Sequence, residues 1–171
     1  MTLDSFHKSQ SKRLGGITVL RLVRIDDISE VYYDAASGIC QSIVLEAGTC
    51  FAVFGFREDS GIYKESAMTV NGIPAVCHEI SFDLARLDGD SHNAFGQLLS
   101  ATGRGMAALV TTACGETFLV GHSPELGPGQ PLKLKNCSGT TGCRPYDATG
   151  YSVTLYCESP SPAMLFGGVL P

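Results

Sequence analysis

The feature that most constrains the fold is a regular alternation of apolar and polar side chains in two segments far apart in the chain. One apolar face of this pattern consists of Val76, His78, Ile80, Phe82 and Leu84. A second such face, near the end of the chain, consists of Tyr151, Val153, Leu155 and Cys157. Successive side chains of a strand point to opposite faces of a sheet. Both segments are therefore predicted to be half-buried strands.

Several other segments have the composition and spacing of strands. Residues 17–25 are apolar on both alternating faces apart from Arg21 and Arg24, which is typical of a strand covered on both sides. The dipeptide Asn71-Gly72, a strong hairpin signal, follows a predicted strand at 62–70. Further strands are expected at residues 31–33, 42–45, 50–56, 105–112, 116–122 and 132–134, with hairpins formed by 42–45 with 50–56 and by 105–112 with 116–122.

One amphipathic helix is predicted over residues 90–102. Asp90 or Ser91 can cap it, because a short side-chain oxygen accepts a hydrogen bond from a free backbone N–H of the first turn. Gly103 is expected to end the helix, and Gly96 within it costs about 1 kcal/mol relative to alanine. The apolar stripe at helical spacing consists of Ala94, Phe95, Leu98 and Leu99. Such a helix needs to pack against the sheet to persist.

The 171-residue chain has the length of one ordinary domain and shows neither an internal repeat nor a linker. Residues 1–16 form a polar arm that ends in two glycines, residues 17–158 a single β-rich domain, and residues 159–171 an apolar C-terminal tail. We predict a mainly β fold, either a β-sandwich or a small β-barrel with one amphipathic helix. The tail either packs onto the core of its own chain or docks on a neighbouring subunit.

Charge and hydropathy argue against two classes of partner. The formal net charge of -5 disfavours sequence-specific nucleic acid binding, which needs a basic excess or stripe. The local basic cluster of Lys8, Lys12 and Arg13 is expected to be solvated. No stretch reaches the roughly 18–20 apolar residues that span a membrane, and the N-terminal residues lack the apolar core of a secretory signal. The chain is therefore expected to be made in the cytosol and to bind no membrane.

The cysteines are expected to be free thiols, because the chain shows no export signal. The seven are Cys40, Cys50, Cys77, Cys114, Cys137, Cys143 and Cys157. Cys137 and Cys143 are the closest pair, but neither a second pair nor a histidine lies near them in the sequence. A structural zinc ion needs about four such ligands. We therefore predict no metal and no other cofactor.

No standard catalytic motif is present, and we predict that the chain is not an enzyme. Residues 121–125 begin like a nucleophile elbow but lack its closing glycine. The histidines, at His7, His78, His92 and His122, are not at metalloprotease spacing. His78, on an apolar face, is expected to be a hydrogen-bonded core or interface histidine. Cys114 is the best candidate nucleophile, on a hairpin turn at 113–115, although turns also accept small residues for structural reasons.

Besides the polar arm of residues 1–16, which is also expected to contact other subunits, two segments favour contacts between subunits. Residues 136–150 are predicted to form a long loop of hydroxyl-bearing and glycine residues, and loops of this length are usually functional or mobile. The apolar tail is the other segment. The residues predicted to lie at a subunit interface are Cys137, Thr140, Thr141, Arg144 and Tyr146 from the loop and Met164, Leu165 and Phe166 from the tail.

The order of these segments resembles that of the tail-tube proteins of long-tailed phages. The polar arm, the strands, the helix at 90–102, the following hairpin and the closing strand carry this resemblance, which covers roughly residues 17–158. The stretches at 76–84 and 107–120 also resemble small structural proteins of phages and prophages from gut bacteria of the Bacteroides type. The resemblance is one of layout and has no diagnostic motif. Seven cysteines are unusual for such a family.

The resemblance implies a β-sandwich or barrel subunit in rings, commonly hexameric, that stack around a lumen. Its partners would be copies of itself and neighbouring virion proteins, and the subunit would be made in the cytoplasm of the bacterial host before it enters the virion.

Three alternatives stay open. One is a neck, tail-terminator or head-decorating phage protein, and another is a thiol enzyme that uses Cys114. The third is a small-ligand-binding β-barrel with a pocket lined by Tyr32, Tyr33, Phe54 and Phe56.

Overall fold

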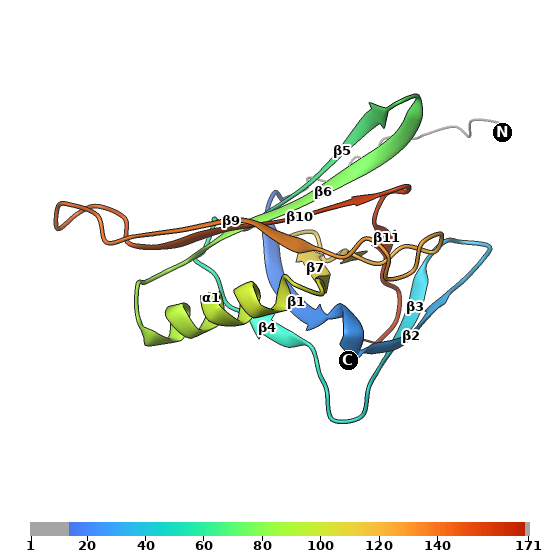
Figure 1. Cartoon of the computed structure of the whole chain (residues 1–171), viewed down its shortest axis with the longest axis horizontal. Coiled ribbons are helices and arrows are strands. Elements are labelled where there is room, and N and C mark those ends of the chain that lie inside the picture. Colours follow the sequence, from blue (N-terminus) through green and yellow to red (C-terminus); the bar gives the residue numbers. More distant parts are fainter. Residues whose placement is uncertain (1–13, 170–171) are drawn as a thin grey trace.

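The computed structural model describes residues 14–169, which form two facing antiparallel sheets, a further two-stranded sheet and one helix (Figure 1). Most of the predicted polar arm, including its basic cluster and His7, lies outside the described residues. The mainly β prediction is confirmed, and the fold is a β-sandwich with an added layer. The described strands do not close into a barrel.

A four-stranded sheet contains both alternating segments. Its strands, in spatial order, are β5 (Ile62–Val70), β6 (Ile73–Leu84), β10 (Gly150–Ser159) and β9 (Lys133–Thr140). The side chains that face the second layer are buried as predicted, among them Ile80, Phe82 and Leu155. Asn71 and Gly72 connect β5 to β6 with φ angles of 52° and 80°, as the hairpin turn with two positive φ angles requires.

The facing five-stranded sheet has strand β1 near its middle. Its strands, in spatial order, are β11 (Met164–Leu165), β8 (Thr117–Val120), β7 (Met106–Thr112), β1 (Ile17–Arg24) and β4 (Ala52–Phe54). Leu20 and Leu22 of β1 belong to the core between the two large sheets, whereas Val23 belongs to a second core on the opposite face. The prediction of a first strand covered on both sides is confirmed, and so is the β7–β8 hairpin.

The second core lies under a small two-stranded sheet. A short 3-10 helix, η1 (Ile25–Asp27), leads from β1 into β2 (Ile28–Tyr33), which pairs with β3 (Cys40–Leu45). Ile25, Cys40 and Ile43 pack against Ala107 and other residues of the five-stranded sheet. The five-stranded sheet is therefore covered on both faces.

Two sequence predictions about pairing are wrong. Residues 42–45 and 50–56 do not form a hairpin, because β3 pairs with β2 while β4 pairs with the edge of β1 in another layer. The predicted loop at 136–150 is shorter, because β9 continues through residue 140 and pairs with β10. Leu134 and Cys137 of β9 pack partly against the main core. This packing and the hydrogen bonds to β10 keep an apparently loop-like sequence in the sheet.

The helix α1 (Gly89–Ala101) begins one residue earlier than predicted, with Asp88 as its N-cap rather than Asp90 or Ser91. The Asp88 carboxylate accepts a hydrogen bond from the backbone N–H of Ser91 at 2.9 Å. Leu98 is buried against the main core, whereas Leu99 of the predicted stripe is 57% exposed. Within residues 14–169, no helix has both the length and the apolar character to cross a membrane.

The C-terminal segment packs onto the core of its own chain, the first of the two alternatives for the tail. Met164 pairs with Leu119 of β8. The backbone N–H of Phe166 donates to the Thr117 carbonyl at 2.8 Å, and that of Gly167 donates to the Cys40 carbonyl at 2.9 Å. These bonds connect the edge of the five-stranded sheet to β3.

Candidate functional site

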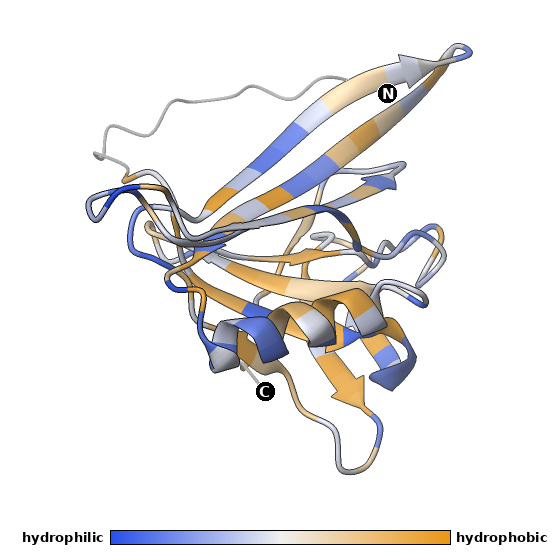
Figure 2. Cartoon of the chain, turned by 60° about the vertical axis from the view of Figure 1, so that its left-hand side comes forward, coloured by the Kyte–Doolittle hydropathy of each residue, from blue (hydrophilic) through white to orange (hydrophobic). Residues whose placement is uncertain are grey.

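The most prominent surface feature is the outer half of the β5–β6 hairpin, residues 66–75, which we call the distal hairpin. It stands away from the rest of the molecule in both views (Figures 1 and 2). Residues 66–69 and 71–74 are all exposed, so neither face of this ribbon is covered. The segment contains no charged residue, and Met68 and Ile73 are 38% and 69% exposed. Isolated two-stranded ribbons are at best marginally stable in water, so an uncovered ribbon of this composition favours a contact with a partner.

The four-stranded sheet has two open edges. Its outer strands are β5 on one side and β9 on the other, and among the described residues no strand pairs with the free edge of either. Open edges present unpaired backbone N–H and C=O groups and are usually blocked by charge, proline or a bulge. The distal part of β5 has neither charge nor proline between Ser66 and Val70. This edge is therefore suited to pairing with another chain.

The outward face of the same sheet is polar and largely neutralised by its own ion pairs. Lys135 donates to Glu79 at 2.8 Å and lies 4.9 Å from the ring centroid of Tyr156. The hydrogen bond from Lys135 lowers the pKa of Glu79. The hydroxyls of Ser81 and Thr154 are 3.3 Å apart. This face is suited to contact with water.

A polar cluster around the buried His78 lies at the base of the distal hairpin, on the inward face. The Tyr63 hydroxyl donates to Glu65 at 2.7 Å and is 2.9 Å from Nδ1 of His78. His78 is 2% exposed, and its Nε2 is 3.3 Å from the carbonyl oxygen of Ser161. The backbone N–H of Ala163 donates to Glu65 at 2.8 Å. The cluster joins the hairpin to the C-terminal segment, which agrees with the prediction that His78 is a hydrogen-bonded core histidine.

The other two described histidines lie elsewhere. Nδ1 of His122 contacts the Tyr33 hydroxyl between β8 and the β2–β3 sheet. Nδ1 of His92 is 3.1 Å from the Tyr151 hydroxyl at the start of α1. Within residues 14–169, no group of three or more His, Cys, Asp or Glu side chains is arranged to hold a metal ion.

The cysteines are all free thiols. Burial raises the pKa of Cys40 to about 11 and that of Cys157 to about 12, so these two are ordinary core thiols. Cys50, Cys114 and Cys143 are exposed. Cys114 lies on the β7–β8 turn as predicted, and its Sγ donates to the carbonyl oxygen of Leu14 at 3.4 Å.

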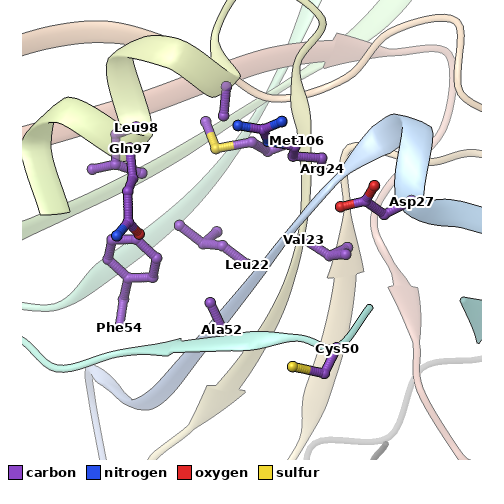
Figure 3. Close-up of a pocket in the computed structure, with 11 residues that line it drawn as sticks. Leu22, Val23, Arg24, Asp27, Cys50, Ala52, Phe54, Gln97, Leu98 and Met106 are labelled. Carbon is purple, nitrogen blue, oxygen red and sulfur yellow. The ribbon is translucent and has the colours of Figure 1, made fainter. Parts of the chain in front are cut away.

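A groove of about 240 Å³ lies between α1, β1 and β4 (Figure 3). We call it the α1–β4 groove. Apolar side chains form most of its lining: Leu22, Val23, Ala52, Phe54, Leu98, Ala101 and Met106. The polar lining residues are Arg24, Asp27, Cys50 and Gln97.

The four aromatic residues expected to line one ligand pocket are not brought together. Phe54 lines the α1–β4 groove, whereas Phe56 packs against Phe82 with the ring centroids 6.2 Å apart. Tyr33 contacts His122, and Tyr32 is 47% exposed. The expectation of a shared aromatic pocket is therefore wrong.

The predicted interface residues fall into two separate groups. Thr140, Thr141, Arg144 and Tyr146 are exposed where β9 leads toward β10, and Cys137 is half-buried. In the tail, Met164 and Phe166 are buried at 8% exposure each, and Leu165 is 38% exposed. Burial in the chain's own core removes Met164 and Phe166 as contact residues. The loop lies at one end of the molecule, far from β11 (Figure 1).

Acid should destabilise the fold through His78, which is buried, and His122, which is half-buried. Burial lowers the pKa of both His78 and His122 from the usual value of 6.5. As the pH falls below about 6.5, the unfolded chain therefore takes up protons before the folded one, and the free energy of unfolding decreases until the pH reaches the lowered pKa. The slope can reach about 1.4 kcal/mol per pH unit for each histidine.

Urea unfolding between pH 7.5 and 5.5 measures this slope. The variants His78→Gln and His122→Gln should each flatten it, and His92→Gln, at an exposed position, is the matched control that should leave it unchanged. A slope that persists when both His78 and His122 are replaced would contradict the assignment.

Comparison with known proteins identifies no relative: no protein-family model, no curated protein and no solved structure matches this chain.

Proposed function

We propose that the chain is a virion structural subunit that assembles with copies of itself into rings, which stack to form a phage tail tube. The observation that carries this proposal is the four-stranded sheet with two open edges, β5 and β9. The layout resemblance to tail-tube proteins supports the same conclusion.

The direction of the strands makes the two edges complementary. All three pairs within the sheet are antiparallel, so β5 and β9 run in opposite directions. Rotation about an axis roughly parallel to the strands then places β9 of one copy antiparallel to β5 of the next. Such a head-to-tail contact closes into a ring when the rotation divides a full turn, and a closed ring leaves no free edge.

The two faces of the sheet have the chemistry that such a ring requires. The inward face is covered by the five-stranded sheet, and the outward face carries hydroxyl groups and the Lys135–Glu79 ion pair. With the sandwich on the outside, this polar face would line a water-filled lumen. The balanced charge on it would keep passing nucleic acid from binding tightly, because tight binding to phosphates needs excess positive charge.

The first test is the mass and shape of the purified protein in solution. Native mass spectrometry and negative-stain electron microscopy should show a discrete ring and, at higher concentration, stacks of rings. A single ring that never stacks would favour a neck or tail-terminator role instead. A monomer at every concentration would overturn the proposal.

Two neighbouring proline substitutions test the edge directly. Successive backbone N–H groups of a strand point to opposite sides, so one of Ser66→Pro and Ala67→Pro removes an N–H from the free edge of β5. The variant that removes this N–H should keep the wild-type melting temperature but no longer form the ring. The other variant removes a hydrogen bond to β6 and should melt at a lower temperature. Unchanged ring mass in both variants would show that this edge makes no contact.

A further inference from the structure

We infer that the distal hairpin of one copy inserts into the α1–β4 groove of a second copy, so that subunits also join head to tail along the direction of the strands. This inference rests on the proposed function, since it describes how the proposed rings would stack. The ring contact uses the backbone edge of β5, whereas the contact inferred here uses side chains near the hairpin turn, such as Met68 and Ile73.

The distal hairpin has the chemistry of an inserted element. Ten consecutive residues, 66–75, lack charge in a chain in which 17% of residues are charged. Met68 and Ile73 are exposed on it without any covering element. Exposed apolar ribbons are a liability for a free monomer, and burial in a partner removes that liability.

The α1–β4 groove has matching chemistry. Its apolar lining, which includes Leu22, Phe54 and Met106, has Arg24 and Gln97 as exposed polar neighbours (Figure 3). The groove volume of about 240 Å³ exceeds the ~150 Å³ of an engineered cavity that holds a benzene molecule. It therefore has room for a large side chain such as that of Ile73. An uncharged hairpin also leaves no unpaired charge against the apolar lining.

The positions of the hairpin and the groove require a second copy. The hairpin projects from one side of the molecule, and α1 with β4 lies on the other side in both views (Figures 1 and 2). A hairpin therefore cannot reach the groove of its own chain. A contact between two different surfaces of the same protein continues from copy to copy and forms an open stack.

The native Cys50 gives a direct test, because it is exposed and lines the groove. In the full-length variant Ile73→Cys, mild oxidation with diamide should form disulfides between copies and produce a ladder on a non-reducing gel. Peptide mapping should find the bond between residues 73 and 50. Adding Cys50→Ser should abolish the ladder. A ladder that maps to Cys114 or Cys143, or no ladder at all, would overturn the inference.

A charge placed on the hairpin gives an independent test. Ile73→Asp should weaken stacking at least tenfold in sedimentation at a fixed concentration, with an unchanged melting temperature. Val169→Asp is the matched control, since Val169 is also apolar and is 94% exposed outside the hairpin. Rings that stack without a 50–73 cross-link and tolerate Ile73→Asp would overturn the docking while leaving the proposed function intact. A wild-type chain that stays monomeric would overturn both.

Discussion

Replacing Phe166 with alanine is expected to lower the free energy of unfolding by about 3–5 kcal/mol. Phe166 is 8% exposed and packs in the second core with Cys40 and Leu119. Its backbone joins the edge of the five-stranded sheet to β3 through the hydrogen bonds of residues 166 and 167. The small side chain of alanine leaves a cavity between these two layers. Urea denaturation followed by circular dichroism measures the loss.

The neighbouring residue provides the control for this prediction. Leu165 is 38% exposed in the same short strand, so Leu165→Ala should cost well under half as much. Equal effects of the two substitutions would mean that the segment contributes little specific packing. For the same reason, deletion of residues 160–171 should produce a chain that is less stable, and not simply less associated.

The sequence predicts those elements whose patterns are local. The alternation at 76–84 and 151–157 predicts two half-buried strands, because burial of one face determines which side chains point inward; that the two pair at the centre of one sheet is known from the structure. Asn71-Gly72 predicts its turn because both residues tolerate positive φ. The helix is also predicted from its local pattern. Its N-cap is Asp88 rather than Asp90 or Ser91; all three residue types cap helices well, so the sequence does not distinguish between them.

The sequence does not predict elements that depend on a distant partner. Residues 136–140 read as a loop, yet they pair with β10 and form an edge strand. The sequence leaves open whether residues 164–166 pack on their own core or dock on a neighbour, and the structure pairs β11 with β8, more than forty residues earlier in the chain. Edge strands take their structure from their neighbours, and no periodic signal of their own is needed.

The candidate contact surfaces also differ in whether a local sequence pattern reveals them. The sequence suggests the loop and the tail as contacts, but Met164 and Phe166 of the tail are buried in the core of their own chain. The sequence does not identify the distal hairpin as a contact surface, because a strand pattern does not show how far a strand extends beyond its sheet. One signal was present: ten uncharged residues surround the Asn71-Gly72 turn, and an edge ribbon of a free monomer would normally carry charge. The α1–β4 groove involves four separate segments and leaves no such signal.

Replacing Gly150 with alanine is the second substitution for which we expect a large loss of stability, at least about 3 kcal/mol. Gly150 begins β10 with a φ angle of 134°, a conformation that side-chain-bearing residues rarely adopt. A Cβ at this position would lie 2.1 Å from the carbonyl oxygen of Leu84, at the end of β6. A backbone atom cannot move aside as a flexible side chain can, so the two central strands would have to separate at this end.

The matched control is the same substitution at Gly96, within α1. A Cβ at Gly96 meets no atom within 4 Å, and its φ is in the ordinary range. Gly96→Ala should therefore stabilise the protein, by about 0.5–1 kcal/mol, through the greater helix propensity of alanine. Thermal unfolding of the two variants beside the wild type should show shifts of opposite sign. If the Gly150→Ala variant has the same melting temperature as the wild type, β6 and β10 do not approach each other at this end as closely as the structure shows.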